Sequence, residues 1–394
     1  MSKLDELIAE LCPEGVEYKC LGKVCNVLRG KRLTKKELSE QYQYPVFHGG
    51  LIPLGKYKDY NRKANQTMVI NTGSVGEVVW SAVPFWSSDG TFTIETQGNI
   101  DNRFVYHFLK SQEPYLKSQK REGGVPTIDR DVIEKIQIPI PPLPIQQEIV
   151  RILDTFTELE AELEAELEAR KKQYEYYRDK LLTPVEHDGQ WLLNGKEVKW
   201  KTLRDICFQT SNIKWKDAKE SYHYIDLTSV SRENHKIIET KIINAKNAPS
   251  RAQQIVKKDD VIFATTRPTL RRFAIISNDF DNEIASTGYC ILRANADIVL
   301  PKWIYHNISA SSFNSYIEKN QEGSAYPSIS DAKVKSYKIP IPPLSEQQRI
   351  VAILDRFDAL CNDLTSGLPA EIEARRKQYE YYRDKLLTFR EAKT

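Results

Sequence analysis

Residues 138–183 read IPIPPLPIQQEIVRILDTFTELEAELEAELEARKKQYEYYRDKLLT, and residues 339–388 repeat the pattern as IPIPPLSEQQRIVAILDRFDALCNDLTSGLPAEIEARRKQYEYYRDKLLT. The opening IPIPPL is identical in the two copies, as are the twelve residues 172–183 and 377–388, and the second copy is four residues longer. Repetition over this length fixes the architecture before any local feature does. The chain is therefore expected to contain two copies of one unit.

Each copy has the apolar spacing of one long helix. In the first copy, apolar residues recur every three or four positions from Ile145 to Leu167, and Tyr174, Tyr177 and Leu181 resume the stripe. This spacing predicts a charged helix with one narrow apolar seam, from about Ile145 to Leu182, that begins after the prolines of the IPIPPL segment. Such a seam needs a partner helix. The other copy is the first candidate, and a solvated single helix or an oligomer seam are the alternatives. In the second copy, Gly367 and Pro369 predict a kink or break.

A globular segment precedes each helix and is also repeated in outline. Short strand-like runs, such as Thr67–Ile70 and Asp260–Ala264, alternate with Gly, Asn and Asp turns, which predicts a mixed α/β fold. The corresponding stretches are Val16–Cys25 and Val198–Cys207, Asn71–Gly76 and Ala264–Pro268, Trp86–Gly90 and Ala285–Gly288, and Gly123–Ile128 and Gly323–Ile329. The segments diverge between these stretches, as expected for one binding module duplicated to recognise two different ligands.

The expected organisation follows from these repeats. The predicted parts are a short N-terminal helix (1–15), a first globular domain (16–142), a long helix (143–183), a linker (184–196), a second globular domain (197–343), and a second long helix with a tail (344–394). The two helices are expected to pair antiparallel as a coiled coil and to give the chain an internal pseudo-twofold repeat.

Composition narrows the class of protein. Of 394 residues, 28% are charged and 40% apolar, which is typical of a globular protein, and the formal charge is only +3. The six cysteines show no CxxC pair or zinc-like spacing, so we expect reduced thiols. The N-terminus lacks the pattern of a signal peptide, and no apolar run reaches the length of a membrane span. A cytoplasmic protein without a membrane partner is expected.

The sequence carries no recognisable catalytic motif. It has no Ser/His/Asp set, no metal cluster and no glycine-rich cofactor fingerprint. Gly50–Lys56 resembles the start of a phosphate loop, but Tyr57 stands where a magnesium-binding hydroxyl residue belongs. Basic and aromatic residues do interleave in the divergent interior of both globular segments. Any one such cluster could be a solvated face, but clusters in both copies favour nucleic acid as the ligand.

The repeated IPIPPL, the two Gln-Gln pairs that follow it, the doubled KQYEYYRDKLLT and residues 367–372 (GLPAEI) together resemble the specificity (S) subunit of type I restriction-modification systems. The resemblance covers nearly the whole chain. It implies two target-recognition domains, each recognising one half of a bipartite site on double-stranded DNA. It also implies two methyltransferase (M) subunits that bind S-adenosylmethionine, restriction (R) subunits that use ATP and Mg, and a role in defence against phage. No cofactor would bind this chain, which would be non-catalytic by itself.

We expect the helix pair to set the spacing between half-sites and to dock the M subunits. The alternatives are a coiled-coil scaffold with protein-binding modules and a self-sufficient restriction-modification enzyme. Arg271 and Arg272 are expected to bind phosphates, because adjacent arginines after a strand-like run rarely serve a core. The candidate DNA-binding residues are Lys31, Arg32, Lys35, Lys36, His48, Lys56, Lys58, Arg62, Ser74, Lys214, Lys216, Lys258, Arg267, Arg271, Arg272 and Tyr326. The candidate subunit-docking residues are Tyr174, Tyr176, Tyr177, Tyr379, Tyr381 and Tyr382.

Overall fold

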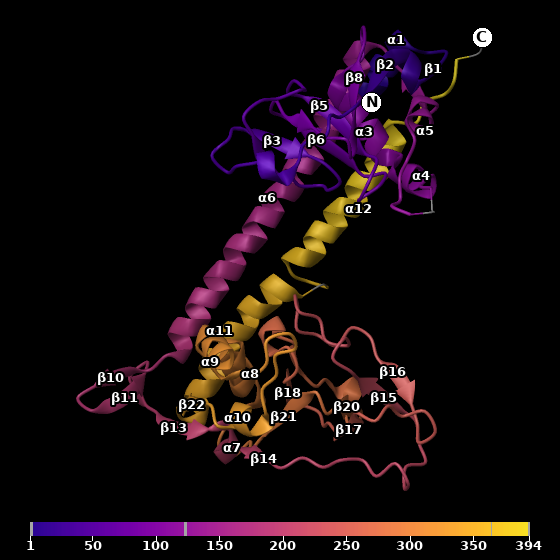
Figure 1. Cartoon of the computed structure of the whole chain (residues 1–394). Coiled ribbons are helices and arrows are strands. Elements are labelled where there is room, and N and C mark those ends of the chain that lie inside the picture. The colour runs from indigo at the N-terminus through magenta and orange to yellow at the C-terminus, as the bar shows by residue number, and fades with distance from the viewer. Residues whose placement is uncertain (1–2, 122–123, 364, 393–394) are drawn as a thin grey trace. The chain divides into compact units, whose positions relative to one another are not determined.

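The computed structural model describes residues 3–121, 124–363 and 365–392 (Figure 1). The chain divides into two compact units, unit 1 (Met1–Glu162 with Glu373–Thr394) and unit 2 (Leu163–Ile372). Both unit boundaries fall inside helices, because α6 (Leu143–Leu182) and α12 (Leu368–Leu386) each contribute to both units. Across the described residues, no helix has the length and apolar character needed to cross a membrane.

The globular part of unit 1 contains two small sheets. One is antiparallel with the order β2–β8–β5–β6, and the other has the order β4–β3–β7, in which β3 and β7 run parallel. Every residue of β5 is buried, because Val69 faces a core shared with the helices and Met68 packs with Phe47 and Phe85 on the other side. The strands are β2 (Cys25–Arg29), β3 (Tyr44–Phe47), β4 (Gly55–Tyr57), β5 (Gln66–Ile70), β6 (Val78–Ser81), β7 (Trp86–Ser87) and β8 (Thr91–Thr96).

Unit 2 repeats this plan. Its sheets have the orders β14–β21–β18–β19 and β16–β15–β20–β17, and β15 and β20 are parallel, as β3 and β7 are in unit 1. The duplicated mixed α/β fold predicted from the sequence is therefore confirmed. The strands are β14 (Cys207–Phe208), β15 (Tyr222–Ile225), β16 (Lys241–Ile243), β17 (Ala252–Ile255), β18 (Val261–Ala264), β19 (Phe273–Ile275), β20 (Ile284–Ser286) and β21 (Tyr289–Ala294).

The short helices are also repeated. In unit 1 they are α1 (Lys3–Leu11), α2 (Leu21–Val24), α3 (Asn102–Ser111), α4 (Glu113–Ser118) and α5 (Arg130–Glu134), with the 3-10 turn η1 (Lys35–Glu37). In unit 2 they are α7 (Leu203–Ile206), α8 (Pro301–Ser309), α9 (Ser311–Asn320) and α10 (Asp331–Lys335), with the 3-10 turns η2 (Pro268–Leu270) and η3 (Asn278–Phe280). The segment between the repeats is a small meander rather than a loop, since β10 (Val185–His187), β11 (Gln190–Leu193) and β12 (Lys196–Glu197) pair in sequence order.

The repeated IPIPPL segment is a strand that leads into a helix. Its isoleucines and first proline belong to β9 (Gln137–Ile140), paired with β1 (Glu17–Cys20), and to β22 (Lys338–Ile341), paired with β13 (Lys199–Thr202). Proline is tolerated because each of these strands has a single neighbour. The buried amides of Gln146 and Gln347 then donate to Pro141 O (2.8 Å) and Pro342 O (2.9 Å). The repeated glutamine therefore ties the start of each long helix to its strand.

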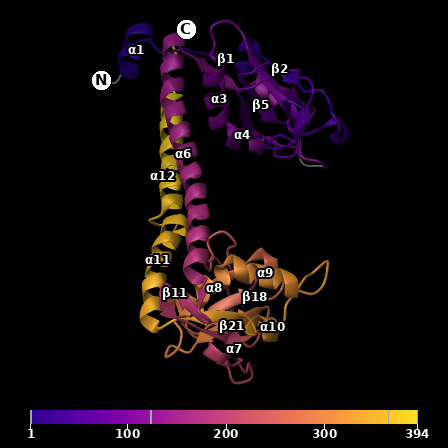
Figure 2. The same cartoon turned by 90° about the vertical axis from the view of Figure 1, so that its left-hand side faces the viewer.

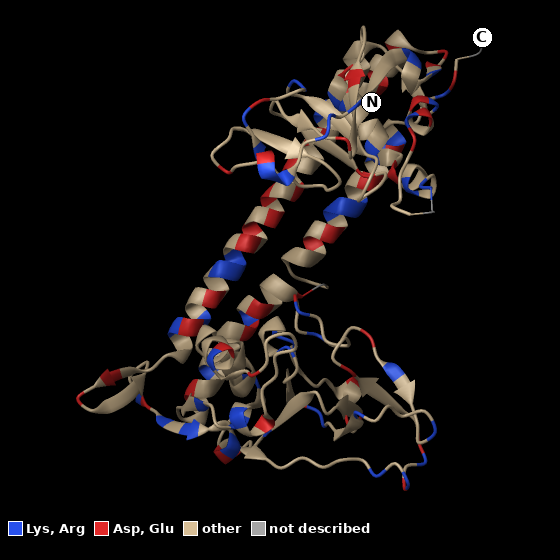
Figure 3. Cartoon of the chain, in the orientation of Figure 1, with Lys and Arg blue, Asp and Glu red and all other residues tan. Residues whose placement is uncertain are grey.

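The long helices pair with each other, as predicted. In unit 1, α6 runs antiparallel to α12: Phe156 stacks on Tyr382 with ring centroids 5.5 Å apart, and Glu160 binds Arg376 (2.8 Å). In unit 2, α6 contacts α11 (Leu344–Asn362), where Phe357 stacks on Tyr177 (6.0 Å). Figure 2 shows α6 beside α12 and α11. Charged residues lie along α6 (Figure 3), with a run of acidic residues from Asp154 to Glu168 that is followed by basic residues at 170–172, as expected of a solvated side.

The second long helix is interrupted. The structure ends α11 at Asn362 and begins α12 at Leu368, which confirms the break predicted from Gly367 and Pro369. A side chain at Gly367 would lie 2.5 Å from Ala359 O, so glycine allows the close return of the main chain. The helical part of residues 344–394 is thus two helices, α11 and α12.

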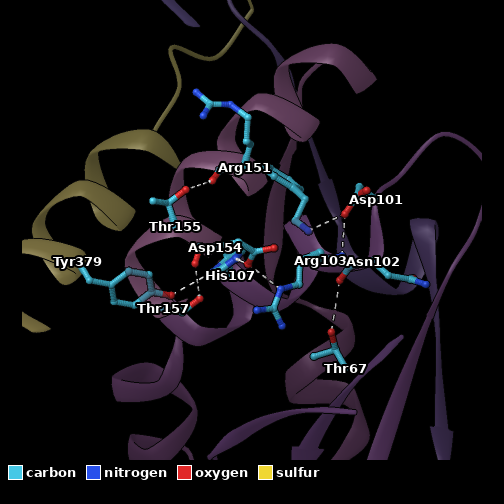
Figure 4. A network of polar contacts seen from close by, with 11 residues as sticks. Thr67, Asp101, Asn102, Arg103, His107, Arg151, Asp154, Thr155, Thr157 and Tyr379 are labelled. Atoms are coloured by element: carbon cyan, nitrogen blue, oxygen red, sulfur yellow. Dashed lines mark hydrogen bonds and ion pairs between the residues drawn. The ribbon is translucent and has the colours of Figure 1, made fainter. Parts of the chain in front are cut away.

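A hydrogen-bonded triad centred on a buried histidine fastens a helix of the other repeat to each globular part, and Figure 4 shows the triad of unit 1. In unit 1, Asp154 Oδ1 binds His107 Nε2 (2.8 Å), and His107 Nδ1 binds the hydroxyl of Tyr379 (3.0 Å). Burial lowers the pKa of His107. For Asp154, burial acts to raise the pKa, but hydrogen bonds from His107 and Arg103 outweigh it and the pKa is lowered.

The same triad occurs in unit 2. Asp355 Oδ1 binds His306 Nε2 (3.0 Å), and His306 Nδ1 binds the hydroxyl of Tyr174 (3.3 Å). In both units the tyrosine belongs to the repeated KQYEYY segment of the opposite repeat, α12 for unit 1 and α6 for unit 2. Each globular part is therefore completed by a helix that follows the other globular part in the sequence.

Candidate nucleic-acid interface

Loops gather at one end of the parallel strands in unit 1. The strands β3 and β7 end together at Phe47 and Ser87, and β5 ends at Ile70. Main-chain hydrogen bonds then join the following loops: Asn71 N donates to Gly90 O (3.0 Å) and Ser74 N donates to Gly49 O (2.9 Å). We call residues 48–50, 71–74, 88–90 and 124–128 the strand-end loops of unit 1.

Unit 2 has a matching set. Thr265 N donates to Gly288 O (2.8 Å), and Ile329 N donates to Thr265 O (2.9 Å), just as Ile128 N donates to Asn71 O (3.1 Å) in unit 1. Isolated bridges join Thr72 to Thr127 and Thr266 to Ser328. We call residues 226–229, 265–271, 286–288 and 324–328 the strand-end loops of unit 2. The correspondence of Asn71–Gly76 with Ala264–Pro268, predicted from the sequence, is confirmed.

The matched loops carry unlike side chains. Unit 1 presents His48, whose Nδ1 lies 3.3 Å from Asp89 Oδ1, and exposed Ser74, while a side chain at Gly73 would lie 2.3 Å from Gly49 O. Unit 2 presents Arg267 over the ring of exposed Tyr326 (4.6 Å). Imidazole, hydroxyl, carboxylate and guanidinium groups can all bond to base edges in the major groove. One main-chain scaffold thus supports two chemically different surfaces.

A basic loop adjoins the strand-end loops of unit 1. Lys31 N donates to Ser87 O (2.8 Å), the indole of Trp86 donates to Lys31 O (2.8 Å), and Leu33 N donates to Ser88 Oγ (3.4 Å). The main chain of this loop is therefore anchored, while the side chains of Lys31 and Arg32 are exposed. Long cations on a fixed main chain at the rim of the loops suit phosphate contacts.

The other predicted cations of unit 1 lie further away or are tethered. Lys35 and Lys36 are exposed on η1, and Ser39 N donates to Lys56 O (3.0 Å), which groups them with exposed Lys56 on β4. Exposed Lys58 follows β4, whose end pairs with the start of β3, so it lies away from His48. Arg62 is half-buried and donates to Arg29 O (3.1 Å), and burial lowers its pKa. Its geometry is that of a loop tether.

In unit 2, the structure separates the predicted lysines. Exposed Lys214 and Lys216 flank Trp215, whose indole donates to Ala252 O (2.8 Å). Ala252 pairs with Ser286 at the end of β20, so these lysines adjoin the strand-end loops. Lys258 precedes β18 whereas Arg267 follows it, so Lys258 lies at the opposite end of that strand. It does not join the other candidates.

Arg271 and Arg272 were predicted to bind phosphates because adjacent arginines after a strand-like run rarely serve a core, but in the structure both help to pack the loops. Both side chains are half-buried and hold main-chain carbonyls, since Arg271 donates to Ser309 O (2.6 Å) and Arg272 donates to Val230 O. Burial lowers the pKa of Arg271, and the nearby Arg178 lowers it further. These arginines pack the loops of unit 2 together, so their first role is structural. Their contact with DNA stays a prediction.

The structure also corrects the docking residues. Tyr174 and Tyr379 are each 7% exposed and complete the buried triads, so they cannot face a partner. They could not be told from their neighbours by sequence alone, because all three tyrosines of each segment lie close together in a short repeat. The exposed members are Tyr176, Tyr177, Tyr381 and Tyr382.

Sequence reasoning missed three residues at the loops. The exposed Arg251 lies beside the strand-end loops of unit 2, because its carbonyl accepts from Thr287 N (2.8 Å). Asp89 pairs with His48, and Asn71 buries its side chain where the loops of unit 1 meet. A single arginine gives no signal in a sequence with many cations. In the described ranges, no group of three His, Cys, Asp or Glu residues could hold a metal ion.

Comparisons with known proteins agree with this arrangement. A family model described as "Type I restriction modification DNA specificity domain" matches residues 13–169 and 195–374. The chain is 33% identical to the EcoR124I/EcoR124II type I restriction enzyme specificity subunit of Escherichia coli, over 100% of this chain and 99% of that protein. It is 28% identical to a putative type I restriction enzyme specificity subunit of Haemophilus influenzae, over 95% of this chain and 96% of that protein.

A solved structure has the same fold. The crystal structure of a type I restriction-modification system S subunit from M. genitalium aligns with a TM-score of 0.58 and 17% identity, covering 95% of this chain and 96% of that one. The family model matches the chain twice, and each match contains one set of strand-end loops.

Proposed function

The chain belongs to the type I restriction-modification specificity subunits, and on that premise we propose that each set of strand-end loops recognises one half of a bipartite site on double-stranded DNA. The observation that carries this proposal is the matched pair of loop sets. Their main-chain hydrogen bonds are the same, but their side chains differ. Two copies of one scaffold with unlike surfaces are suited to an asymmetric site made of two unlike half-sites.

The proposal assigns separate tasks to the side chains. Exposed cations at the rim, such as Lys31, Arg32, Lys214 and Lys216, neutralise phosphates and fix the register of the protein on the duplex. His48, Ser74 and Arg267, on the strand-end loops themselves, contact base edges, and Tyr326 faces DNA beside Arg267, which lies over its ring. This division follows from placement, because the rim residues extend from anchored loops while the others stand where the strands end.

The chain acts, in this proposal, within a larger complex. Exposed tyrosines on α6 and α12 dock two methyltransferase subunits, one near each globular part. Those subunits bind S-adenosylmethionine and methylate adenine, and restriction subunits supply ATP- and Mg-dependent steps. The chain itself recognises the sequence and holds the assembly together, without a catalytic group or cofactor of its own. The helix pair sets the spacing between half-sites.

The test compares two charge-matched variants of the full chain assembled with its modification subunits. Replacing Lys31 and Arg32 with alanine should weaken DNA binding and reduce the slope of log affinity against log salt by about two, at roughly 0.9 per lost phosphate contact. Replacing Lys257 and Lys258, which are exposed at the far end of β18, removes the same charge and should change the slope little. Equal effects in the two variants would mean that the strand-end loops do not face DNA.

A further inference from the structure

Two exposed residues of unit 2 stand where unit 1 has small or aliphatic ones. The bridges of Thr72 to Thr127 and of Thr266 to Ser328 align the two sets of loops. In that alignment, Arg267 takes the position of Gly73, and Tyr326 takes the position of Val125. The same main-chain site therefore carries an arginine and a tyrosine in one unit and neither in the other.

The main chain at this position favours glycine. Gly73 has φ 92° and Arg267 has φ 48°, so both lie in the left-handed region. Glycine adopts this region readily, whereas a residue with a β-carbon does so at a cost in free energy. Strained residues of this kind cluster at functional sites, where the surrounding structure holds them in place. An arginine at this position, against that preference, points to a task for its side chain.

The surroundings fix Arg267 firmly. Its main-chain N–H donates to Pro327 O (2.7 Å), and buried Pro268 begins η2 directly after it. The guanidinium group lies 4.6 Å from the ring centre of Tyr326, and that tyrosine is 71% exposed. Stacking occupies the face of the guanidinium plane and leaves the donors on its edge for another ligand.

We propose that Arg267, oriented by Tyr326, is the specificity-determining residue of unit 2 and recognises a guanine through its O6 and N7 atoms in the major groove. The paired donors of arginine match these two acceptors, which adjoin each other only on guanine. Tyr326 is the positioning residue. The inference rests on the proposed function of the strand-end loops. It deepens that function by naming the base, and it confines the guanine contact to the half-site that unit 2 recognises.

The test uses the full chain assembled with its modification subunits and a DNA library in which the site is randomised, and it measures which sequences are methylated. Arg267→Gly installs the residue of unit 1 and suits the left-handed main chain, so the fold should be retained. It should reduce discrimination for guanine at one position roughly 5- to 150-fold and leave the other half-site unchanged. Tyr326→Val, also the residue of unit 1, should reduce it less.

Arg267→Lys separates a base contact from a phosphate contact. It keeps the charge but replaces the rigid planar donor pair of arginine with a flexible ammonium group, so the preference for guanine should fall while the salt dependence of binding stays the same. If Arg267→Gly keeps the base preference at every position, or if Arg267→Lys keeps full discrimination for guanine, the inference is overturned. If the unmodified complex methylates without any sequence preference, the proposed function itself fails, and this inference falls with it.

Discussion

Replacing Tyr379 with phenylalanine removes a single oxygen atom from the buried triad of unit 1 and should destabilise that unit by roughly 1–3 kcal/mol. The aspartate must accept a hydrogen bond, so His107 donates from Nε2 to Asp154 and its Nδ1 accepts from the tyrosine hydroxyl (3.0 Å). His107 is 0% exposed. Without the hydroxyl, Nδ1 is left buried and unbonded, and the expected range is the cost of such an atom.

Two matched variants set the scale for this effect. Tyr174→Phe removes the equivalent hydroxyl from unit 2, where the bond to His306 is longer (3.3 Å), so its cost should be smaller, about 1 kcal/mol. Tyr381→Phe removes a hydroxyl from a side chain that is 62% exposed, and its effect should stay within about 0.5 kcal/mol.

Hydrogen exchange measured by mass spectrometry is the suitable assay, because the two units need not unfold together. In Tyr379→Phe, amides of α3 and α12 should exchange roughly 5 to 150 times faster, while those of α8 should not change. Tyr174→Phe should give the reverse pattern. If Tyr379→Phe behaves like Tyr381→Phe, the triad does not fasten α12 to unit 1, and the account of the repeated tyrosine is refuted.

Three further predictions concern the helices and one half-buried histidine. Inserting Leu-Glu-Ala-Glu after Glu166 adds about 6 Å of helix. At about 3.4 Å per base pair, the insertion should lengthen the gap between half-sites by one or two base pairs. An unchanged gap with full activity would contradict a role of the helix pair in setting the spacing. Tyr381→Ala should weaken the docking of one modification subunit in native mass spectrometry, and a stable one-to-one complex of the unmodified chain would refute the expected ratio of two. Burial and the nearby Arg271 and Arg178 lower the pKa of His235 to about 4, whereas the pKa of an unfolded histidine is about 6.5. Between these two pH values the folded chain binds fewer protons than the unfolded chain. Unit 2 should therefore lose stability as pH falls from about 6.5 to 4. Asparagine also tolerates the positive φ at this position. His235→Asn should therefore reduce the change of unfolding free energy with pH, measured by urea titrations at pH 7, 5.5 and 4.5. The same change with pH in both proteins would contradict this prediction.

The sequence predicted the features that depend on local pattern and repetition. The apolar period of residues 145–181 predicted α6, Gly367 predicted the end of α11, and the aligned stretches after β5 and β18 are matching loops in the structure. Each of these predictions needed only neighbouring residues or a comparison of one repeat with the other. This is why the architecture could be inferred without a structure.

The roles of single side chains depended on contacts between residues distant in the sequence. Arg271 was predicted to be free to bind phosphate because its carbonyl partner, Ser309 in α8, is distant in the sequence. Tyr379 seemed available for docking because its partner, His107, lies in the other repeat. The histidines appeared scattered in the sequence, although His107 and His306 occupy matching places in the two copies. A comparison of the two repeats for polar residues in matching positions could have found the triads.

Sequence-resolved methylation by the assembled complex tests the central claim most directly. DNA carrying all sequences is methylated by the unmodified chain and by a chimaera in which residues 203–337 come from a relative with another target, each with its modification subunits. We predict a bipartite motif with a fixed gap for the unmodified chain, and a chimaera motif in which one half is replaced and the other half is retained. A change in both halves, or a single continuous motif, would contradict the claim that each unit recognises its own half-site.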